Sequence, residues 1–508
     1  MSRILATVVA VSDNEVSFAR RRFMGATVGA GLTRALAGPW ASRAFAQPAP
    51  AENPWLAQAS DYGATRPATF AAPLPIPPIK RPARAAATVD EVELVARAGA
   101  AQPLPGAPTA ILGYDGAWPG PTLLATRGRP LQLTLRNQLD QPTNIHNHGH
   151  HVAADSDGHP LDVVKAGHSR IYTYPNNQSA GTYWYHDHAF GLTGEHVYRG
   201  LAGAYIIRDP AQAALGLPDG EHDVPLLLQD RLFDADNALS YSVGAGAIFT
   251  GALGNTMCVN GAHTPFLAVA TRRYRFRLIN GSNARNFRLA LASGEPMLQI
   301  ASDGGLLASP VMQRTVELAP SERADVIVDF GRARPGDTIV LRNVDRTWPE
   351  LPDVLRFHVT RKEADPSRVP ARLATVPRVP EAEATTTRRL RFQLADGQWT
   401  LNGLRYDPAR IDFRSRLGTT EIWEIQNGEQ TQTHPFHRHM VPFQILDIDG
   451  APPPAALAGW KDTVSVPPAG RVRIIMRFYG FTGTYVFHCH KLEHEDHAMM
   501  LQEQIVKA

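Results

Sequence analysis

Cysteine is almost absent from this sequence of 508 residues, which contains only Cys258 and Cys489. A disulfide-rich scaffold is therefore excluded, and no intrachain bridge can form if Cys489 binds a metal. Charge of one sign is lacking as well. The formal net charge of +3 becomes −1 without residues 1–46, because that segment holds six Lys/Arg and two Asp/Glu and leaves 45 against 46. This balance indicates neither a nucleic-acid partner nor a basic membrane-binding face.

Long apolar runs are also missing, so we expect no membrane insertion. The apolar stretch after Arg22 is interrupted by Arg34 and is too short to span a bilayer. It follows a twin arginine in residues 19–25 (ARRRFMG) and precedes a small-x-small cleavage site at residues 44–46 (AFA). The three features predict a twin-arginine signal peptide at residues 1–46 and export of the folded protein to a bacterial periplasm.

Glycine and proline, by contrast, are plentiful at 41 each and separate many short apolar runs, which favours an all-β fold. A chain of this length is typical of about three domains. Residues 131–136 (LQLTLR) alternate apolar and polar side chains, as a half-buried strand does. Further strands are expected at residues 201–207, 224–228, 273–278 and 324–330.

The most informative stretch lies near the end of the chain, around Cys489. His488 and His490 flank this cysteine, His494 follows five residues later and Met499 ten residues later. Two histidines, one cysteine and a weak axial methionine form a blue-copper electron-transfer site. On a strand, however, His488 and His490 share one face while Cys489 points away, so those two histidines cannot join it on one metal. The stretch therefore predicts contact with two metal centres, and a second histidine for the blue site from upstream.

The same segment occurs twice in the chain. Residues 181–188 (GTYWYHDH) match residues 483–490 (GTYVFHCH), and residues 143–148 (TNIHNH) have a looser counterpart at residues 433–439 (THPFHRH). Repeats in matching contexts indicate duplication of a whole domain. Asp187 stands where Cys489 stands, so the first copy lacks the thiolate for a blue site of its own.

Together these motifs resemble the three-domain multicopper oxidases, the laccase-like bacterial group, over nearly all of the chain after residue 46. Residues 114–122 (YDGAWPGPT) and 460–464 (WKDTV) are similar to other family segments, and residues 494–497 (HEDH) to the bilirubin oxidase and spore-coat laccase branch. The resemblance implies three consecutive cupredoxin-like Greek-key β-barrel domains. We expect the first domain at residues 91–215, the second at residues 216–362 and the third at residues 387–508. An extended arm at residues 47–90 is expected to lie on the first domain, and a linker at residues 363–386 to precede the third.

The resemblance also implies four copper ions and assigns their ligands. The type 1 copper would be held by His434, Cys489 and His494, with Met499 as axial ligand rather than Met500. The type 2 copper would take His146 and His437. The type 3 pair would take His148, His186, His188, His439, His488 and His490. Asp157 and Glu495 match acidic positions near the three-copper cluster and are expected to assist with protons, which the reduction of O2 to water consumes.

The function implied is an oxidase of phenols, aromatic amines or bilirubin-like pigments, with O2 as acceptor. We expect the protein to be a monomer. Electrons would pass singly from the type 1 copper through Cys489 to His488 and His490. The alternative enzyme is a periplasmic oxidase of cuprous or other metal ions in copper tolerance, although the nine methionines are scattered. A copper nitrite reductase, a structural relative without copper and a metal-storage protein fit less well, because the ligand set is complete and includes the Cys489–Met499 spacing.

Overall fold

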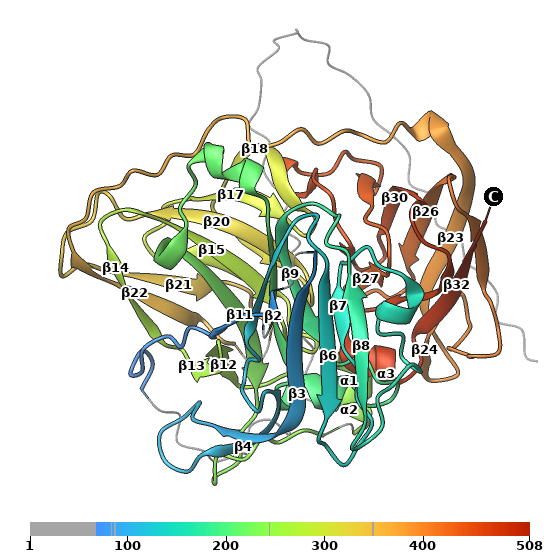
Figure 1. Ribbon diagram of the computed structural model, residues 1–508, viewed down its shortest axis with the longest axis horizontal. Coiled ribbons are helices and arrows are strands. Elements are labelled where there is room, and N and C mark those ends of the chain that lie inside the picture. Colours follow the sequence, from blue (N-terminus) through green and yellow to red (C-terminus); the bar gives the residue numbers. More distant parts are fainter. Residues whose placement is uncertain (1–67, 83, 86–87, 243, 348–349, 508) are drawn as a thin grey trace, which may run out of the picture. The chain divides into compact units, whose positions relative to one another are not determined.

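The computed structural model describes residues 68–82, 84–85, 88–242, 244–347 and 350–507, and their regular secondary structure is mostly strand, with few helices (Figure 1). The predicted signal peptide at residues 1–46 and the first part of the predicted arm lie outside these residues. Within the described ranges the strands form six sheets, which pack in pairs around three large apolar cores. No helix in these ranges is long and apolar enough to cross a membrane.

The first group of strands surrounds a core of leucine, valine and tyrosine side chains. Leu131, Leu133 and Leu135 point into it from β6, because alternate residues of a strand face the same side. One sheet runs β1 (Ile79–Lys80), β5 (Thr122–Thr126), β10 (Ala202–Arg208), β9 (Gly181–His186), β7 (His146–His148). The other runs β2 (Arg84–Ala85), β3 (Asp90–Ala101), β6 (Leu131–Asn137), β8 (Ser169–Tyr174), with β4 (Thr109–Tyr114) paired to β3.

The second group has a separate core, and its sheets carry the buried, nearly continuous apolar runs expected of central strands. One sheet runs β13 (Ala262–His263), β12 (Thr256–Val259), β11 (Asp223–Arg231), β15 (Arg273–Asn280), β20 (Arg323–Asp329), β17 (Met297–Ser302), β18 (Gly305–Gln313). The other runs β14 (Phe266–Ala270), β22 (Asp353–Arg361), β21 (Thr338–Asn343), β16 (Phe287–Leu291), β19 (Val316–Leu318).

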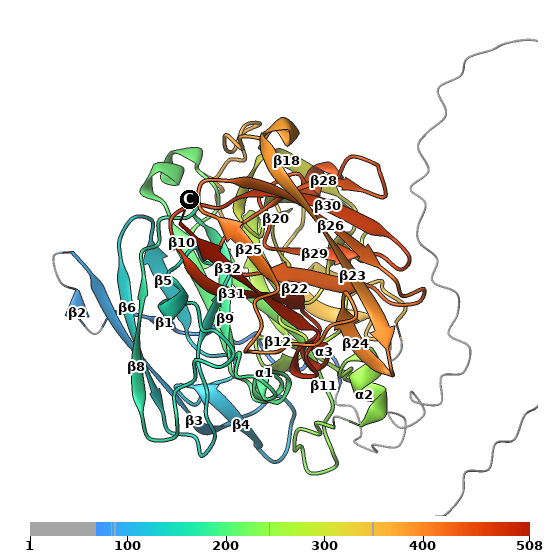
Figure 2. The ribbon, with the colours of Figure 1, turned by 90° about the vertical axis from the view of Figure 1, so that its right-hand side faces the viewer.

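The third group, whose strands face the viewer in Figure 2, contains Cys489 in its core. One sheet runs β24 (Gln398–Leu401), β23 (Ala384–Ala395), β26 (Thr420–Asn427), β30 (Arg471–Arg477), β28 (Gln444–Ile448). The other runs β25 (Phe413–Arg416), β32 (Met500–Val506), β31 (Gly483–Cys489), β27 (His434–Arg438), β29 (Thr463–Val466). Strand β23 begins inside residues 363–386, the range expected to be a linker.

The first and third groups repeat one topology. The order β5-β10-β9-β7 in the first group matches the order β25-β32-β31-β27 in the third. In each case the first pair in this order is parallel, β5 with β10 and β25 with β32, and the other two pairs are antiparallel. The duplication predicted from the two histidine-rich segments is thus confirmed at the level of strand order.

The described part of the arm, residues 68–82, contacts both of the first two groups. Strand β1 extends a sheet of the first group by pairing with β5, as expected. Before it, however, Phe70 and Leu74 donate main-chain hydrogen bonds to Thr264 and Phe266, and Leu74 is buried in the second core. The arm therefore lies against the second group as well as the first, because the apolar Leu74 side chain packs in the second core.

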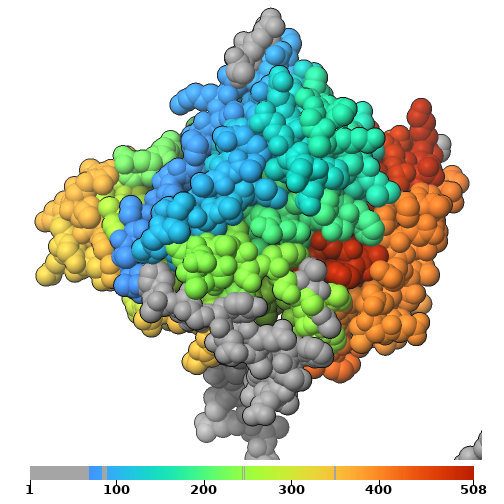
Figure 3. Space-filling model, turned by 90° about the horizontal axis from the view of Figure 1, so that it is seen from below, coloured from blue at the N-terminus to red at the C-terminus, as the bar shows by residue number. Residues whose placement is uncertain are grey.

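Three short α-helices lie close to one another at the loops between the groups: α1 (Thr193–Arg199), α2 (Ala245–Thr250) and α3 (Leu492–Asp496). Asp496 accepts hydrogen bonds from the main-chain N–H groups of Thr193 and Gly194 at the start of α1. Seen from below, a red surface of C-terminal residues lies between the green and orange surfaces (Figure 3). The segment carrying Cys489 and His494 therefore packs against loops of the other two groups.

Candidate metal centres

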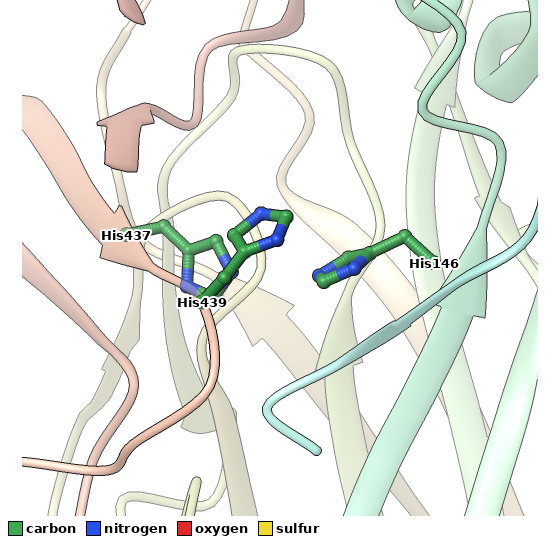
Figure 4. A group of neighbouring side chains, drawn as sticks. All are labelled: His146, His437 and His439. Atoms are coloured by element: carbon green, nitrogen blue, oxygen red, sulfur yellow. The ribbon is translucent and has the colours of Figure 1, made fainter. Parts of the chain in front are cut away.

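The histidine pairs occupy equivalent positions on the two repeated sheets. His146 on β7 lies opposite His186 on β9, and His437 on β27 lies opposite His488 on β31. The second histidine of each pair follows two residues later, on the same side of the chain. Figure 4 shows His437 and His439 of the third group extending towards His146 of the first. Each group therefore presents four imidazole rings to the other.

The eight rings form one buried cluster. His146 stacks on His439 with ring centroids 3.9 Å apart, and His148 stacks on His437 at 3.7 Å. Each of the eight residues is at most 1 % exposed. Donor atoms lie within 4.8 Å of one another in three all-histidine sets, which are His146, His437, His439; His146, His148, His186; and His188, His439, His488. His490 joins the cluster through ring contacts with His148 and His186.

Most of these rings use one nitrogen for a protein contact and keep the other free. The Nδ1 atoms of His146, His186, His437 and His488 contact the main-chain oxygens of Asp157, Asp187, Asp462 and Cys489 at 2.6–3.0 Å. Such contacts fix the tautomer and the orientation of a metal-binding histidine. The Nε2 atoms of His146, His186, His437 and His439 are buried without a hydrogen-bond partner in the described structure. A bound metal would satisfy them.

Burial also sets the charge of the rings. It lowers the pKa of His186 to about 4 and that of His488 to about 3. It lowers the pKa of His146, His437 and His439 well below the usual value, with neighbouring histidines adding to the effect. These rings are therefore neutral at neutral pH, which is the form that binds metals. An all-imidazole set of this kind suits copper and can leave positions open for another ligand.

A second donor set lies on the other side of β31. The Cys489 Sγ atom is 3.4 Å from His434 Nδ1 and 3.6 Å from His494 Nδ1, and all three side chains are buried. The His494 Nε2 donates to the main-chain oxygen of Phe249 in α2 at 3.0 Å. Burial raises the pKa of the Cys489 thiol to about 12, so a bound cation is needed to hold it as the thiolate. Two imidazoles and a thiolate fit copper in its blue form.

Of the two candidate axial methionines, Met499 shares the core of Cys489. Its main-chain oxygen accepts from the Cys489 N–H, and its own N–H donates to the His494 oxygen. Met500 belongs to a different apolar cluster, with Tyr406, and lies opposite His488 in the pairing of β31 with β32. This arrangement favours Met499, since neighbouring residues of a strand face opposite sides.

Both predicted carboxylates contact the histidine cluster. Asp157 Oδ2 is 2.7 Å from His439 Nδ1, and burial raises the pKa of Asp157 to about 8. Glu495 Oε1 and Oε2 lie 3.1 Å from His188 Nδ1 and 3.2 Å from His488 Nδ1, and burial raises its pKa well above the usual value. Two buried carboxyl groups able to hold a proton therefore border the cluster from opposite groups of strands.

The sequence analysis missed Asp462 as a partner of the cluster. Its carboxylate Oδ1 lies 3.0 Å from His148 Nε2, and Thr463 Oγ1 lies 3.2 Å from the same nitrogen. The sequence offers one signal for it, the family segment at residues 460–464, which by itself assigns no role to Asp462. Cys258 matches its prediction as a buried residue, and both cysteines are free.

Comparison with known proteins gives consistent results. Two family models described as multicopper oxidase match residues 96–212 and 378–507. A laccase of Bacillus subtilis is 36 % identical over 463 residues, covering 77 % of this chain and 90 % of that protein. A bilirubin oxidase of Albifimbria verrucaria is 36 % identical over 469 residues, covering 85 % and 80 %. The crystal structure of a laccase from Pediococcus acidilactici superimposes with a TM-score of 0.81 at 34 % identity, covering 87 % and 94 %.

Proposed function

This chain belongs to the multicopper oxidase family and is a laccase-like, copper-dependent oxidoreductase with O2 as acceptor, and we propose that it oxidises phenols, aromatic amines or bilirubin-like pigments. The proposal for these substrates rests on the names of the similar laccase and bilirubin oxidase. Three cupredoxin-like domains at residues 91–215, 216–362 and 387–508 would carry this activity.

One observation carries the mechanism: consecutive residues of β31 belong to two different donor sets. Cys489 faces His434 and His494, while its neighbours His488 and His490 face the histidine cluster. The main chain from 488 to 490 therefore connects the two sets without any gap. Copper bound in both sets would supply one-electron exchange with the substrate and with O2.

We propose the ligand assignment that the family resemblance implies, and the clustering of these side chains supports it. The type 1 set is His434, Cys489, His494 and axial Met499. The type 2 pair is His146 and His437, which share a donor set. The type 3 histidines are His148, His186, His188, His439, His488 and His490, of which His188, His439 and His488 form a set of their own. Four copper ions per chain follow from this assignment.

Asp157 and Glu495 are proposed to hold and deliver the protons that O2 reduction consumes. Each is buried, each contacts a histidine of the cluster, and burial favours the protonated form of each. A carboxyl group in that state can donate at neutral pH. The two carboxyls approach through different histidines, His439 for Asp157 and His188 and His488 for Glu495, so they serve different sides of the cluster.

Export is part of the proposal as well. Residues 1–46 would direct the folded protein through the twin-arginine route to the periplasm, where the mature monomer would begin at Gln47. Export in the folded state allows copper to be bound before or after transport, and the two free cysteines require no oxidising step.

The experiment that tests the substrate assignment measures oxygen uptake by purified, copper-loaded enzyme. The reductants are a phenol, an aromatic amine, bilirubin, Cu(I) and Mn(II), each at the same concentration. We expect turnover of at least one organic reductant, with four reducing equivalents consumed per O2. Turnover of Cu(I) alone would favour the metal-ion oxidase instead, and full copper with no turnover of any reductant would contradict the oxidase.

A further inference from the structure

The segment at residues 460–464 supplies none of the candidate ligands, yet all three groups of strands meet on it. Arg323, the first residue of β20 in the second group, donates from Nη1 to Asp462 Oδ1 at 2.7 Å and from Nη2 to Asp462 Oδ2. Both side chains are buried. A two-pronged contact of this kind fixes the carboxylate in orientation as well as in position.

Arg323 is itself held in place from two sides. Its main-chain N–H donates to Asp303 Oδ1 at 2.8 Å, and its Nε donates to the main-chain oxygen of Thr182 on β9 at 3.2 Å. Lys461 Nζ lies 2.9 Å from Asp303 Oδ2 and 3.2 Å from Glu322 Oε1. Buried charges persist only when they are paired in this way. The guanidinium therefore has little freedom to move away from Asp462.

On its other side, the segment contacts one ring from each histidine-bearing group. Asp462 Oδ1 lies 3.0 Å from His148 Nε2, and the Asp462 main-chain oxygen lies 2.8 Å from His437 Nδ1. Thr463 Oγ1 lies 3.2 Å from His148 Nε2 and 3.3 Å from His437 Nδ1. These are the two rings that stack at 3.7 Å. One short segment thus orients two candidate ligands that come from different groups.

The Asp462 carboxylate lies so close to the main chain after His148 that only glycine fits there. Gly149 has a φ of +80°, and a Cβ atom on it would collide with the Asp462 carboxylate and meet Arg323 Nη2 at 3.0 Å. The main chain carrying His148 is therefore packed directly against the Arg323–Asp462 pair.

From these contacts, and resting on the proposed function, we propose that Arg323 is a positioning residue for the three-copper cluster. It acts through Asp462 and Thr463, which hold the non-ligating nitrogens of His148 and His437. The second group of strands contributes no candidate ligand among the described residues. The contact of Arg323 with Asp462 nevertheless gives this group a direct part in the site. Partners of this kind change metal affinity or activity by about 10- to 100-fold when they are removed.

The test uses Arg323→Lys, which keeps the positive charge and loses the two-pronged contact. A matched control is Arg277→Lys, because Arg277 is also buried in the second group, makes a two-pronged contact with Asp223 and reaches Thr182. Unlike Asp462, its partner Asp223 has no contact with the histidine cluster in the described structure. Copper-loaded proteins are titrated with a chelator, and the type 2 signal is followed by electron paramagnetic resonance.

We expect Arg323→Lys to lose the type 2 copper at about 10- to 100-fold lower chelator concentration, with altered hyperfine splitting, while its blue absorption stays. Arg277→Lys should behave as the unmodified protein in both respects. If the two variants share the same splitting and copper affinity, Arg323 only stabilises the fold and the proposal is overturned. If the unmodified protein binds no type 2 copper, the proposed function fails instead.

A second variant decides the question if Arg323→Lys does not fold. Thr463→Val removes the hydroxyl that contacts both rings and leaves the buried ion pairs intact. We expect a smaller change of the same type 2 splitting. An unchanged splitting in Thr463→Val would overturn the proposal, which requires the Thr463 hydroxyl to orient both rings.

Discussion

Replacing Cys489 by serine is expected to abolish both the blue absorption and the oxidase activity. The intense visible band of a blue site arises from copper bonded to the cysteine thiolate, and serine cannot supply it. Serine keeps the shape of the β31 segment, so His488 and His490 stay in the cluster. Visible absorption and oxygen uptake with the best organic reductant provide the measurement.

Cys258→Ser is the matched control for this variant. Cys258 is equally buried but lies in the second group, where its Sγ atom donates to the main-chain oxygen of Thr256 at 3.9 Å. We expect colour and activity to remain. A blue Cys489→Ser protein would contradict the assignment of the type 1 set.

Replacing Asp157 by asparagine is expected to slow the reaction with O2 and leave the reaction with substrate unchanged. Asparagine fills the same space and can still contact His439, but it has no carboxyl proton to deliver. Loss of a positioned proton donor costs about 10²- to 10⁴-fold in rate. Stopped-flow absorption separates the steps: bleaching of the blue band by substrate without O2, then its return on mixing with O2.

Asp155→Asn serves as the control, because Asp155 lies two residues earlier, exposed on the short 3-10 helix (Ala154–Ser156) that ends just before Asp157. It should behave as the unmodified protein in both phases. Copper analysis of Asp157→Asn must show a full complement. If its blue band then returns at the unmodified rate, Asp157 does not deliver protons.

The sequence contained most of the information for the two donor sets. Strand periodicity alone separates Cys489 from His488 and His490, and the repeated segment indicates which strands pair equivalently. The histidines of the two repeats occupy equivalent positions because the register of β7 with β9 matches that of β27 with β31. His146 lies opposite His186, and His437 lies opposite His488. Local pattern and duplication were sufficient for these features.

The residues around the ligands were not predictable in the same way. Arg323 and Asp462 are 139 positions apart and come from different groups, so no local pattern joins them. The partner of His494 is the main-chain oxygen of Phe249, which any residue could supply. The contact of the arm with the second group was not predictable for a related reason. The Leu74 side chain is buried in a core formed by strands that follow much later in the sequence.

If β31 joins two separate copper centres, removing the Cys489 thiolate should empty one centre and leave the other filled, and copper analysis of the unmodified protein beside Cys489→Ser measures this. With metal content measured per chain after full loading, we predict four copper ions in the unmodified protein. We predict three in Cys489→Ser, with the type 2 resonance retained. Equal copper counts in the two proteins, or loss of the type 2 signal together with the blue one, would contradict the account.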